Sequence, residues 1–497
     1  MKNKLKLNTV LSVVSQIITM ICGFILPRII LSTYGSDENG ILSSVTQFLS
    51  FISLLDLGVG AVIQTAYYKP LSEGDSRLVS LTFNEANKFF KRIAYILIVY
   101  VFVLIGLFIF LEGESFSPFY IAGLVISISI SMFAQYYISA PYSLLLNADQ
   151  KYYISALLSI VCVILNTLFS FGLIKIGAAL PLVKLTSSMI FLIQPIMLSV
   201  YVKKYYSIDK KETDPSFKID QKWNGMAQHC ATVIMNNTDV MILTLFSTLS
   251  NVSVYYINMH VVSCIKAFIN SLSNGYSSLM GDLFVKHKQK ELNSQFDNFE
   301  WIVNNFSVLI FSVTLVLICP FISIYTRGIT DAQYIQPLFS TLLIAGQFVF
   351  CLRIPYNTII CSAGHYRQTQ ISAVVEAIIN ITISIALVYK WGLIGVAIGT
   401  LVAVTYRTLY FVVYINKNII NRSIAKFIKQ LLIDLLCISL IVAIGNFICK
   451  WLNPSVNYIN WVFAGALLFT VSLLIIGIIN VIFYSNKMKT IRTILNK

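Results

Sequence analysis

The sequence predicts an all-α integral membrane protein with about fourteen transmembrane helices, twelve of them in two six-helix lobes. Three observations predict this fold class. Of the 497 residues, 57% are apolar and only 11% are charged, whereas about a quarter of the residues are charged in soluble proteins. Apolar runs of about 18 to 25 residues recur along the chain, each long enough to cross a bilayer as a helix. Two stretches of the first half also recur in the second half.

The apolar runs define fourteen spans. The first run has no small-residue cleavage site behind it, so we expect a retained span rather than a signal peptide. The runs lack the alternating pattern of a β-barrel, and helices therefore have to satisfy the backbone inside the bilayer. The predicted spans are 7–31, 41–66, 90–111, 117–146, 152–174, 177–202, 222–246, 250–280, 300–325, 332–361, 368–389, 392–415, 427–450 and 458–484.

The internal repeat predicts the lobes. PYSLLLNADQKYYISALLSIV, which begins at Pro141, matches PYNTIICSAGHYRQTQISAVV, which begins at Pro355, and KIGAALPLVKL at 175–185 matches WGLIGVAIGTL at 391–401. The offset corresponds to six spans, so the two halves have the same orientation and are related by a pseudo-twofold axis along the membrane normal. The predicted organisation is an N-lobe at 1–202, a cytoplasmic linker at 203–221, a C-lobe at 222–416, and two further spans with a cytoplasmic tail at 417–497.

The charge distribution predicts the orientation in the membrane. The chain has 36 Lys and Arg against 21 Asp and Glu, a formal net charge of +15. Most of the basic residues fall on one side of the spans, in loops at 69–92, 203–222, 286–290 and 417–429 and in the C-terminal tail. The positive-inside rule places these loops and both termini in the cytoplasm. The basic charge therefore has a membrane explanation, and we expect no nucleic-acid partner.

Motifs for chemistry are missing from the sequence. It has no P-loop with a Gly-Lys-Ser/Thr ending, no HExxH and no Cys/His spacing typical of a metal site. All nine cysteines fall within predicted spans, where we expect them to pack rather than to form disulfides. We therefore expect a transporter and not an enzyme, with no catalytic residue, no metal site and no cofactor.

Polar side chains interrupt the seventh span, VIMNNTDVMIL at 233–243. Gln228, Thr232, Asn236 and Asp239 fall on one helix face. The eighth span carries a second stripe that consists of Ser263, Lys266, Asn270, Ser273, Asn274 and Ser277. One interpretation is that both stripes line a water-filled cavity, because charged groups avoid lipid. The alternative is a dry helix–helix interface joined by hydrogen bonds between Asn and Ser side chains.

Ionisable residues inside the spans predict the charge of the transported substrate. They are Arg28, Lys184, Lys266, Arg353 and Arg407 against Asp56, Asp239 and Glu376. The positive excess favours an anionic substrate such as a phosphate or diphosphate group. Snorkelling of Arg28 and interfacial positions for Lys184 and Arg407 are the alternatives, and Asp56 has the alternative of bonding a neighbouring helix. Asp56, Asp239 and Glu376 are the candidates for H⁺ or Na⁺ coupling. Glu376 either titrates or pairs statically with a cation.

Four short segments resemble a known family. They are STYGSDENGIL at 32–42, DLGVG at 56–60, NNTDVMIL at 236–243 followed by NVSVYY at 251–256, and GLIGVAIGT at 392–400. Together they resemble the polysaccharide transporter family, or Wzx-type flippases, of the multidrug/oligosaccharidyl-lipid/polysaccharide exporter (MOP) superfamily. That superfamily also contains multidrug and toxin extrusion antiporters and lipid II flippases. STLSN at 247–251 departs from the commonest family pattern, which has a glycine after the seventh span.

The resemblance implies a V-shaped pair of lobes around a central cavity in a bacterial cytoplasmic membrane. It implies translocation of undecaprenyl-diphosphate-linked oligosaccharide from the cytoplasmic to the outer leaflet by alternating access, for surface polysaccharide. The implied partners are this lipid-linked substrate, membrane lipids, a polysaccharide polymerase and glycosyltransferases. A lipid II flippase and a cation-coupled multidrug exporter are alternatives, and a net negative cavity is expected for the exporter. A membrane scaffold has no use for a two-lobe repeat.

Overall fold

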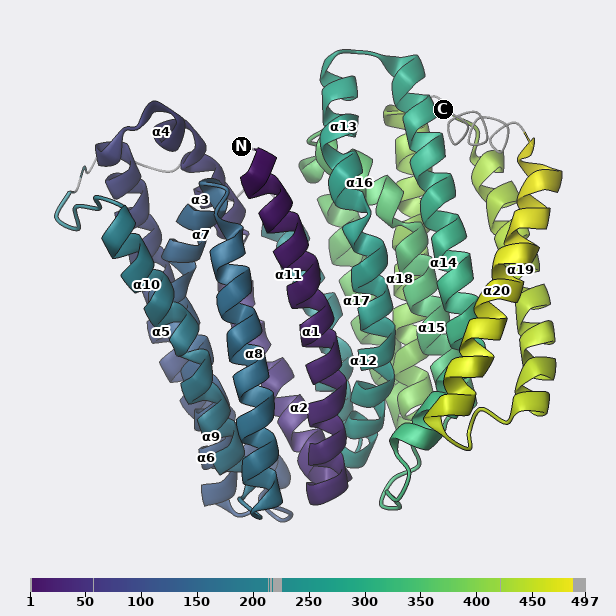
Figure 1. Cartoon of the computed structure of the whole chain (residues 1–497), viewed down its shortest axis with the longest axis horizontal. Coiled ribbons are helices and arrows are strands. Elements are labelled where there is room, and N and C mark those ends of the chain that lie inside the picture. Colours follow the sequence, from purple (N-terminus) through teal and green to yellow (C-terminus); the bar gives the residue numbers. More distant parts are fainter. Residues whose placement is uncertain are drawn as a thin grey trace. The chain divides into compact units, whose positions relative to one another are not determined.

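Every element in the described part of the chain is a helix (Figure 1). The computed structural model describes residues 2–56, 58–212, 214, 217, 226–420 and 422–485, with side chains from residue 7 onward except those of 274 and 275. Twelve of the described helices are long and apolar enough to cross a membrane, and a bent pair, Ser36–Asp56 with Val59–Glu73, makes thirteen. The chain is therefore a multi-pass membrane protein, as predicted.

The predicted seventh span is the exception. It corresponds to α11 (Met226–Phe246), which is long enough but is not among the twelve. Asn236, Asn237 and Asp239 at its centre lower its mean hydropathy. A helix with this composition is stable in a bilayer only when its polar groups find partners other than lipid.

The chain forms two compact units, Met1–Ser253 (unit 1) and Val254–Lys497 (unit 2). The boundary falls inside α12 (Leu249–Ser271) and not in the linker expected at 203–221. Part of that linker, 213, 215–216 and 218–221, lies outside the described residues. The lobe boundaries inferred from the repeat stay a prediction, and the two units are described separately here.

Unit 1 is built around the long helix α5 (Ser76–Glu112), which packs against α6 and α7. Helix α1 (Lys2–Tyr34) packs along α8, and α6 packs along α9. Phe48, Phe83 and Phe108 are fully buried in its core. The other elements are α2 (Ser36–Ser50), η1 (Phe51–Asp56), α3 (Val59–Ala66), α4 (Tyr68–Glu73), α6 (Pro118–Ala134), η2 (Gln135–Ser139), α7 (Ala140–Ala148), α8 (Tyr152–Lys175), α9 (Leu180–Phe191), α10 (Ile193–Tyr205) and α11.

Unit 2 is organised around α14 (Gln289–Tyr325), which contacts α13, α15, α16, α19 and α20. In Figure 1, α19 and α20 stand together beside α14 at the C-terminal end of the chain. Helices α17 and α18 pack closely together, and α18 packs against α15. The bounds are α13 (Ser273–Val285), α15 (Pro337–Leu352), α16 (Ile354–Ser362), α17 (Tyr366–Trp391), α18 (Leu393–Asn418), α19 (Ile424–Leu452) and α20 (Tyr458–Phe483).

The sequence repeat folds alike in both units. Pro141 and Pro355 each lie in the first turn of a short helix, α7 or α16, which follows a break in a longer span. Proline suits this position because its missing N–H has no partner in a first helical turn. A left-handed residue then ends each short helix segment, Gln150 at φ 56° and Gly364 at φ 72°, and a long helix follows.

Candidate functional site

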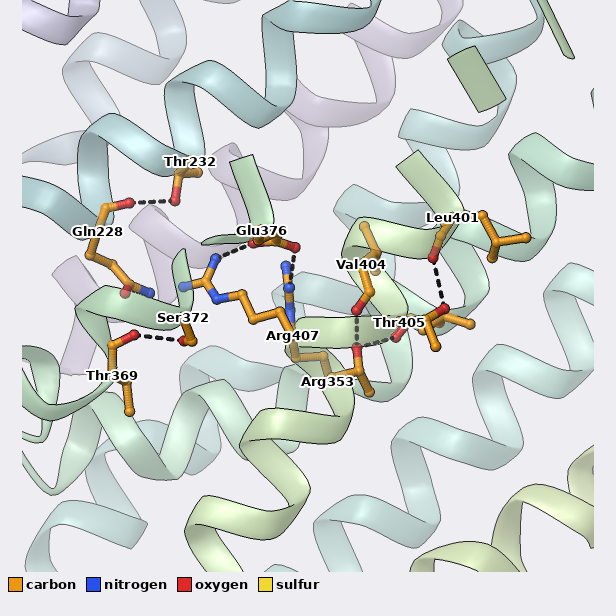
Figure 2. Close-up of polar contacts among 12 residues, drawn as sticks. Gln228, Thr232, Arg353, Thr369, Ser372, Glu376, Leu401, Val404, Thr405 and Arg407 are labelled. Atoms are coloured by element: carbon orange, nitrogen blue, oxygen red, sulfur yellow. Dashed lines mark hydrogen bonds and ion pairs between the residues drawn. The ribbon is translucent and has the colours of Figure 1, made fainter. Parts of the chain in front are cut away.

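A buried charge cluster joins three helices of unit 2 (Figure 2). Glu376 lies on α17, Arg353 at the break between α15 and α16, and Arg407 on α18. Arg353 Nη1 donates to Glu376 Oε1 and Arg407 Nη1 donates to Glu376 Oε2, both at 2.5 Å. Glu376 is 1% exposed, and both arginines are buried. Each carboxylate oxygen therefore has its own guanidinium, and these three side chains carry one positive charge in excess.

Two phenylalanine rings extend this cluster. The guanidinium carbon of Arg353 lies 4.7 Å from the ring centre of Phe350, and that of Arg407 lies 5.0 Å from Phe411. Lys266 Nζ, from α12, lies 3.9 Å from the same Phe350 ring centre. A ring face attracts a cation without neutralising it. We call Lys266, Arg353, Glu376 and Arg407 the cationic cluster.

One donor of the cationic cluster is not used within the described chain. The Nε–H of Arg407 is buried and has no hydrogen-bond partner among the described residues. Buried donors are normally satisfied, because an unmade hydrogen bond costs about 1–3 kcal/mol. An oxyanion that accepts from this group would satisfy it, and guanidinium groups suit phosphate oxygens.

The geometry of Glu376 matches one of its two predicted alternatives, the static ion pair. Each carboxylate oxygen of Glu376 accepts from a different guanidinium group. The use of Glu376 as an ion carrier stays a prediction. The Arg407 side chain is buried against Phe411 and Glu376, and its depth in the membrane stays a prediction.

The other predicted cations lie in unit 1. Arg28 follows Pro27 inside α1, and Lys184 lies on α9; both side chains are half-buried. Among the described residues, no ion pair to Lys184 is present. The repeat pairs Arg353 with Ser139 and, because the second copy is three residues longer before its Ile-Ser-Ala, Glu376 with Ser159. The ion-paired cluster is therefore a property of unit 2 alone.

A row of hydrogen bonds joins α2 and η1 to α11 and the start of α12, all within unit 1. We call this row the polar seam. It consists of Asn39 to Ser253 at 2.7 Å, Ser44 to Thr244 at 2.7 Å, Ser50 to Asn237, and the Ser53 carbonyl to His229 at 3.0 Å. From one hydrogen bond to the next, the residue numbers rise along α2 and η1 and fall along α12 and α11, so the two segments are antiparallel. In the polar centre of α11, the seam supplies Asn237 with a partner.

The two adjacent amides of α11 thus have different environments. Asn237 is buried in the polar seam, whereas Asn236 is exposed, as is Thr232, and Gln228 is half-buried. Asp239 is buried at 4% exposure, unlike the three residues predicted to share its stripe. For Asn237, the helix–helix interface is the interpretation that the geometry matches. Cavity lining by Gln228, Thr232, Asn236 and Asp239 stays a prediction.

The predicted stripe of the eighth span is divided between two helices. Lys266 and Asn270 lie on α12 and Asn274 on α13, with a break at Leu272. Lys266 is half-buried and Asn270 is exposed, whereas the side chain of Asn274 lies outside the described part of the chain. Cavity lining by Asn270 and Asn274 stays a prediction, as does substrate binding by Lys266.

Asp56 ends η1 at the break in the second span. Its half-buried carboxylate faces the backbone N–H of Gly60 and lies within electrostatic range of His229. Gly58 has φ +73°, a conformation that glycine adopts without strain. A Cβ added at Gly58 would lie 3.6 Å from the Cβ of His229. Gly58 therefore lies against α11 at the break between η1 and α3, and Leu57 of the DLGVG segment lies outside the described residues. Ion binding at Asp56 stays a prediction.

Sequence reasoning missed a second polar group in unit 2. Arg422 Nη1 lies 2.7 Å from Glu300 Oε2 and 3.2 Å from Asp297 Oδ1, and Tyr356 donates to Glu300. Asp434, on α19, is buried at 4% exposure. Asp434 is the one carboxylate of the predicted span 427–450, a signal that the count of intramembrane charges left out.

All nine cysteines are free thiols, and the described residues contain no cluster of three or more His, Cys, Asp or Glu that could hold a metal ion.

No family model matches this sequence, and no curated protein matches it. Solved structures do resemble it. The lipid II flippase MurJ in an inward closed conformation has a TM-score of 0.62 at 16% identity, over 97% of this chain and 99% of that chain. An inward-facing multidrug resistance MATE family transporter of the MOP superfamily has a TM-score of 0.62 at 13% identity, over 80% of this chain and 94% of that chain.

A third structure shows that the likeness extends beyond these two. It is a MOP superfamily transporter from Pyrococcus furiosus, described as having a binding pocket of reverse polarity, with a TM-score of 0.58 at 12% identity over 83% of this chain and 94% of that chain. The chain has the fold of the MOP superfamily transporters.

Proposed function

We propose that this protein is a flippase that translocates undecaprenyl-diphosphate-linked oligosaccharide from the cytoplasmic to the outer leaflet by alternating access. The observation that carries the proposal is the pair of arginines on Glu376, which leaves a buried excess of positive charge and an unused Arg407 Nε–H at bilayer depth. Burial of such a group is costly, so charges in membrane helices generally serve a substrate or an ion. A diphosphate offers both the negative charge and the acceptor oxygens.

The extent of the structural likeness supports a lipid-linked substrate. The alignment with the lipid II flippase leaves 3% of this chain unmatched, about 15 of 497 residues, which is less than either α19 or α20. The multidrug transporter alignment leaves 20% unmatched. Most of the two helices beyond the six-helix repeats is thus matched in a lipid II flippase.

The physical role of such a protein is to replace water around a large polar head group. Hydroxyl groups of an oligosaccharide each cost several kcal/mol when they enter hydrocarbon without hydrogen bonds. Polar helix faces such as Thr232 and Asn236, exposed on α11, and Asn270 on α12 offer replacement partners. The cationic cluster would hold the diphosphate, and the lipid tail would stay in the bilayer.

A lipid II flippase is the first alternative, because it needs the same cationic site and the same helix count. A cation-coupled multidrug exporter is the second, and the arginine pair on Glu376 disfavours it because cationic drugs are repelled by a positive site. One structural relative is described as having a pocket of reverse polarity within this fold, so the fold by itself does not decide the charge of the substrate.

The protein's orientation belongs to the same proposal. Basic loops on one side place both termini in the cytoplasm of a bacterial cell. A polymerase and glycosyltransferases of surface polysaccharide synthesis are the proposed partners. Because no ATP-binding motif is present in the sequence, an H⁺ or Na⁺ gradient or consumption of the product on the outer side is the proposed driving force.

The test is reconstitution in vesicles that contain fluorescent undecaprenyl-diphosphate-linked oligosaccharide. A membrane-impermeant reductant that bleaches the outer leaflet measures the rate of translocation. We expect wild type to translocate this lipid and Lys266→Met to lower the rate at least tenfold, equivalent to about 1.4 kcal/mol. Lys390→Met is the matched control, because Lys390 is exposed at the end of α17, and it should keep the wild-type rate.

Two parallel assays separate the alternatives. Translocation of lipid II in preference to the oligosaccharide lipid would favour the peptidoglycan precursor, and gradient-driven export of a cationic dye would favour drug extrusion. In cells, deletion of the gene should cause lipid-linked repeat units to accumulate on the cytoplasmic side while surface polysaccharide falls. Vesicles that translocate none of the lipid substrates would refute the proposed function.

A further inference from the structure

A second acidic group lies in unit 2 at the packing of α14 against α19. Glu300, Asn304 and Ser307 follow one another on one face of α14, and Gln430 and Asp434 share a face of α19. Asp434 follows the first residue of α19 by ten positions, about 15 Å along the helix axis. It therefore lies well inside the predicted span.

The neighbours of Asp434 are neutral amides. Asn304 Nδ2 donates to Asp434 Oδ2 at 3.3 Å, and Gln430 Nε2 donates to Asp434 Oδ1 at 2.9 Å. Among the described residues, no Lys, Arg or His forms an ion pair with Asp434. Glu300 and Glu376, by contrast, each contact at least one guanidinium. A carboxyl group buried without a counter-charge is normally neutralised by a proton.

Two unused acceptors lie on the helix that faces Asp434. Asn304 Oδ1 and Ser307 Oγ are buried and lack a hydrogen-bond partner among the described residues, and their residues are 2% and 0% exposed. Since the Asn304 amide nitrogen already contacts Asp434, its carbonyl oxygen lies beside the same carboxyl group. A protonated carboxyl group is a donor, whereas a carboxylate only accepts. A proton on Asp434 would therefore supply a donor to the side-chain oxygen of Asn304.

A polar route connects Asp434 with the end of unit 2. Gln430, its hydrogen-bond partner, lines a pocket of about 330 Å³ together with Glu300, Lys426 and Tyr484. Tyr484 donates to Gln430, and the Lys426 side chain is largely exposed. Water in this pocket can approach the Gln430–Asp434 pair from the side of the membrane on which α19 begins.

We propose that Asp434 is a proton-binding carboxyl group loaded through this pocket. In the step, a hydronium ion in the pocket transfers its proton to the Asp434 carboxylate, water remains behind, and the new O–H donates to the side-chain oxygen of Asn304. Release is the reverse step. Proton binding stands without any assumption about substrate; its use to drive translocation rests on the proposed function.

The site also has a physical connection to the cationic cluster. Glu300 accepts from Tyr356, which lies on α16 one helical turn after Arg353. A change of charge at Asp434 alters the field at Glu300, and α16 is the element that both networks share. Among the described residues, the titratable and charged groups around Asp434 and its pocket are Asp297 and Glu300 on α14, Tyr356 on α16, Arg422 before α19, Lys426, Lys429 and Cys437 on α19, and Tyr484 after α20.

The test is infrared difference spectroscopy of the purified full-length protein between acid and alkaline buffers, which detects the C=O stretch of protonated carboxyl groups. We expect a band that disappears at alkaline pH in wild type and is missing in Asp434→Asn. Asp297→Asn is the matched control, since Asp297 lies in the same pocket beside Arg422 and Lys426, and it should keep the band. Asp434→Glu should restore a band at a shifted frequency.

A second variant keeps the test decisive if Asp434→Asn does not fold. Asn304→Ala removes the proposed acceptor and should shift the frequency of the band without abolishing it. An unchanged band in both Asp434→Asn and Asn304→Ala would overturn the proposal. Loss of the wild-type band on addition of Na⁺ at constant pH would overturn it as well, in favour of a metal cation.

The same samples separate this site from the proposed function. A pH-dependent band that Asp434→Asn abolishes supports the proton site even when the wild-type vesicles translocate no oligosaccharide lipid. That combination refutes only the proposed substrate.

Discussion

The Tyr356 hydroxyl on α16 donates a hydrogen bond to the Glu300 carboxylate on α14. Both side chains are buried, and Glu300 also pairs with Arg422. Tyr356 belongs to the PY pair that the sequence repeat carries in both halves. This hydrogen bond, together with the packing of the Tyr356 ring on Phe296, joins the short helix after Arg353 to the helix that faces Asp434.

Substitution of Tyr356 by Phe should destabilise the protein by about 1–3 kcal/mol, because it leaves a buried carboxylate oxygen without its donor. Unfolding of the detergent-solubilised protein by heat or denaturant measures the change. Tyr458→Phe is the control, since Tyr458 lies exposed at the start of α20. Equal midpoints for the two variants would show that the hydrogen bond contributes nothing.

Removal of the Glu376 charge should lower the stability of the protein more than Tyr356→Phe does. Glu376→Gln leaves two buried guanidinium groups side by side, and the loss of one partner from a buried ion pair typically costs about 3–5 kcal/mol. A double variant, Glu376→Gln with Arg353→Gln, should lose less than the sum of the two single variants, because the charges are coupled. The exposed pair Lys288–Glu291 provides the control: Glu291→Gln should change stability by less than about 1 kcal/mol. Additive single effects would contradict a coupled cluster.

Glycine is required at position 40. A Cβ on Gly40 would lie 2.1 Å from the backbone oxygen of Leu249, so α2 approaches the start of α12 at a distance that only glycine permits. Gly40→Ala should lower folded yield and the unfolding midpoint. In Gly106→Ala nothing lies within 4 Å of the new carbon, and alanine should be neutral or stabilising in that helix. A stable Gly40→Ala protein would refute the close approach.

The two amides of α11 should respond differently to truncation. Asn237→Ala removes hydrogen bonds to Ser50 and to the Val233 carbonyl and should cost about 1–3 kcal/mol of stability. Asn236→Ala changes an exposed side chain, and its effect on stability should stay within about 0.5 kcal/mol. If Asn236 lines the substrate path, the same variant should lower the translocation rate. Unfolding curves together with the vesicle assay distinguish these roles, and a reversed order of stability would refute the seam.

Stability at one end of unit 1 should depend on an ammonium group. Partial burial acts to lower the pKa of Lys151, but its hydrogen bonds to Asp149 and Tyr206 outweigh burial and raise that pKa. A raised lysine pKa means that the stabilisation is complete below the unfolded value of about 10.4 and is lost as the pH rises through the folded value. Lys151→Met should therefore cost about 1 kcal/mol at any neutral pH, and the difference from wild type should shrink only in strong alkali. Unfolding midpoints measured from neutral to alkaline pH check this, and a difference that grows with pH would contradict it.

The Glu376 cluster shows where sequence-based reasoning ended. The sequence identified Arg353, Glu376 and Arg407 as charges within spans, and the structure places all three in one cluster. The sequence left open whether Glu376 titrates or forms an ion pair, because 23 and 31 residues separate Glu376 from its two arginine partners. Helix periodicity assigns a residue to a face but says nothing about which distant helix covers that face.

The sequence by itself determined that this is a membrane protein built from helices. It also determined thirteen of the fourteen proposed spans and the repeat around Pro141 and Pro355. These depend on local composition, since any apolar run of sufficient length has to satisfy its backbone within one helix. Only the tertiary structure decided that Asn237 lies in a seam with Ser50, that Glu376 has two guanidinium partners and that Asp434 has neutral ones. Those outcomes depend on which helix faces meet, and packing between distant segments, rather than local pattern, selects them.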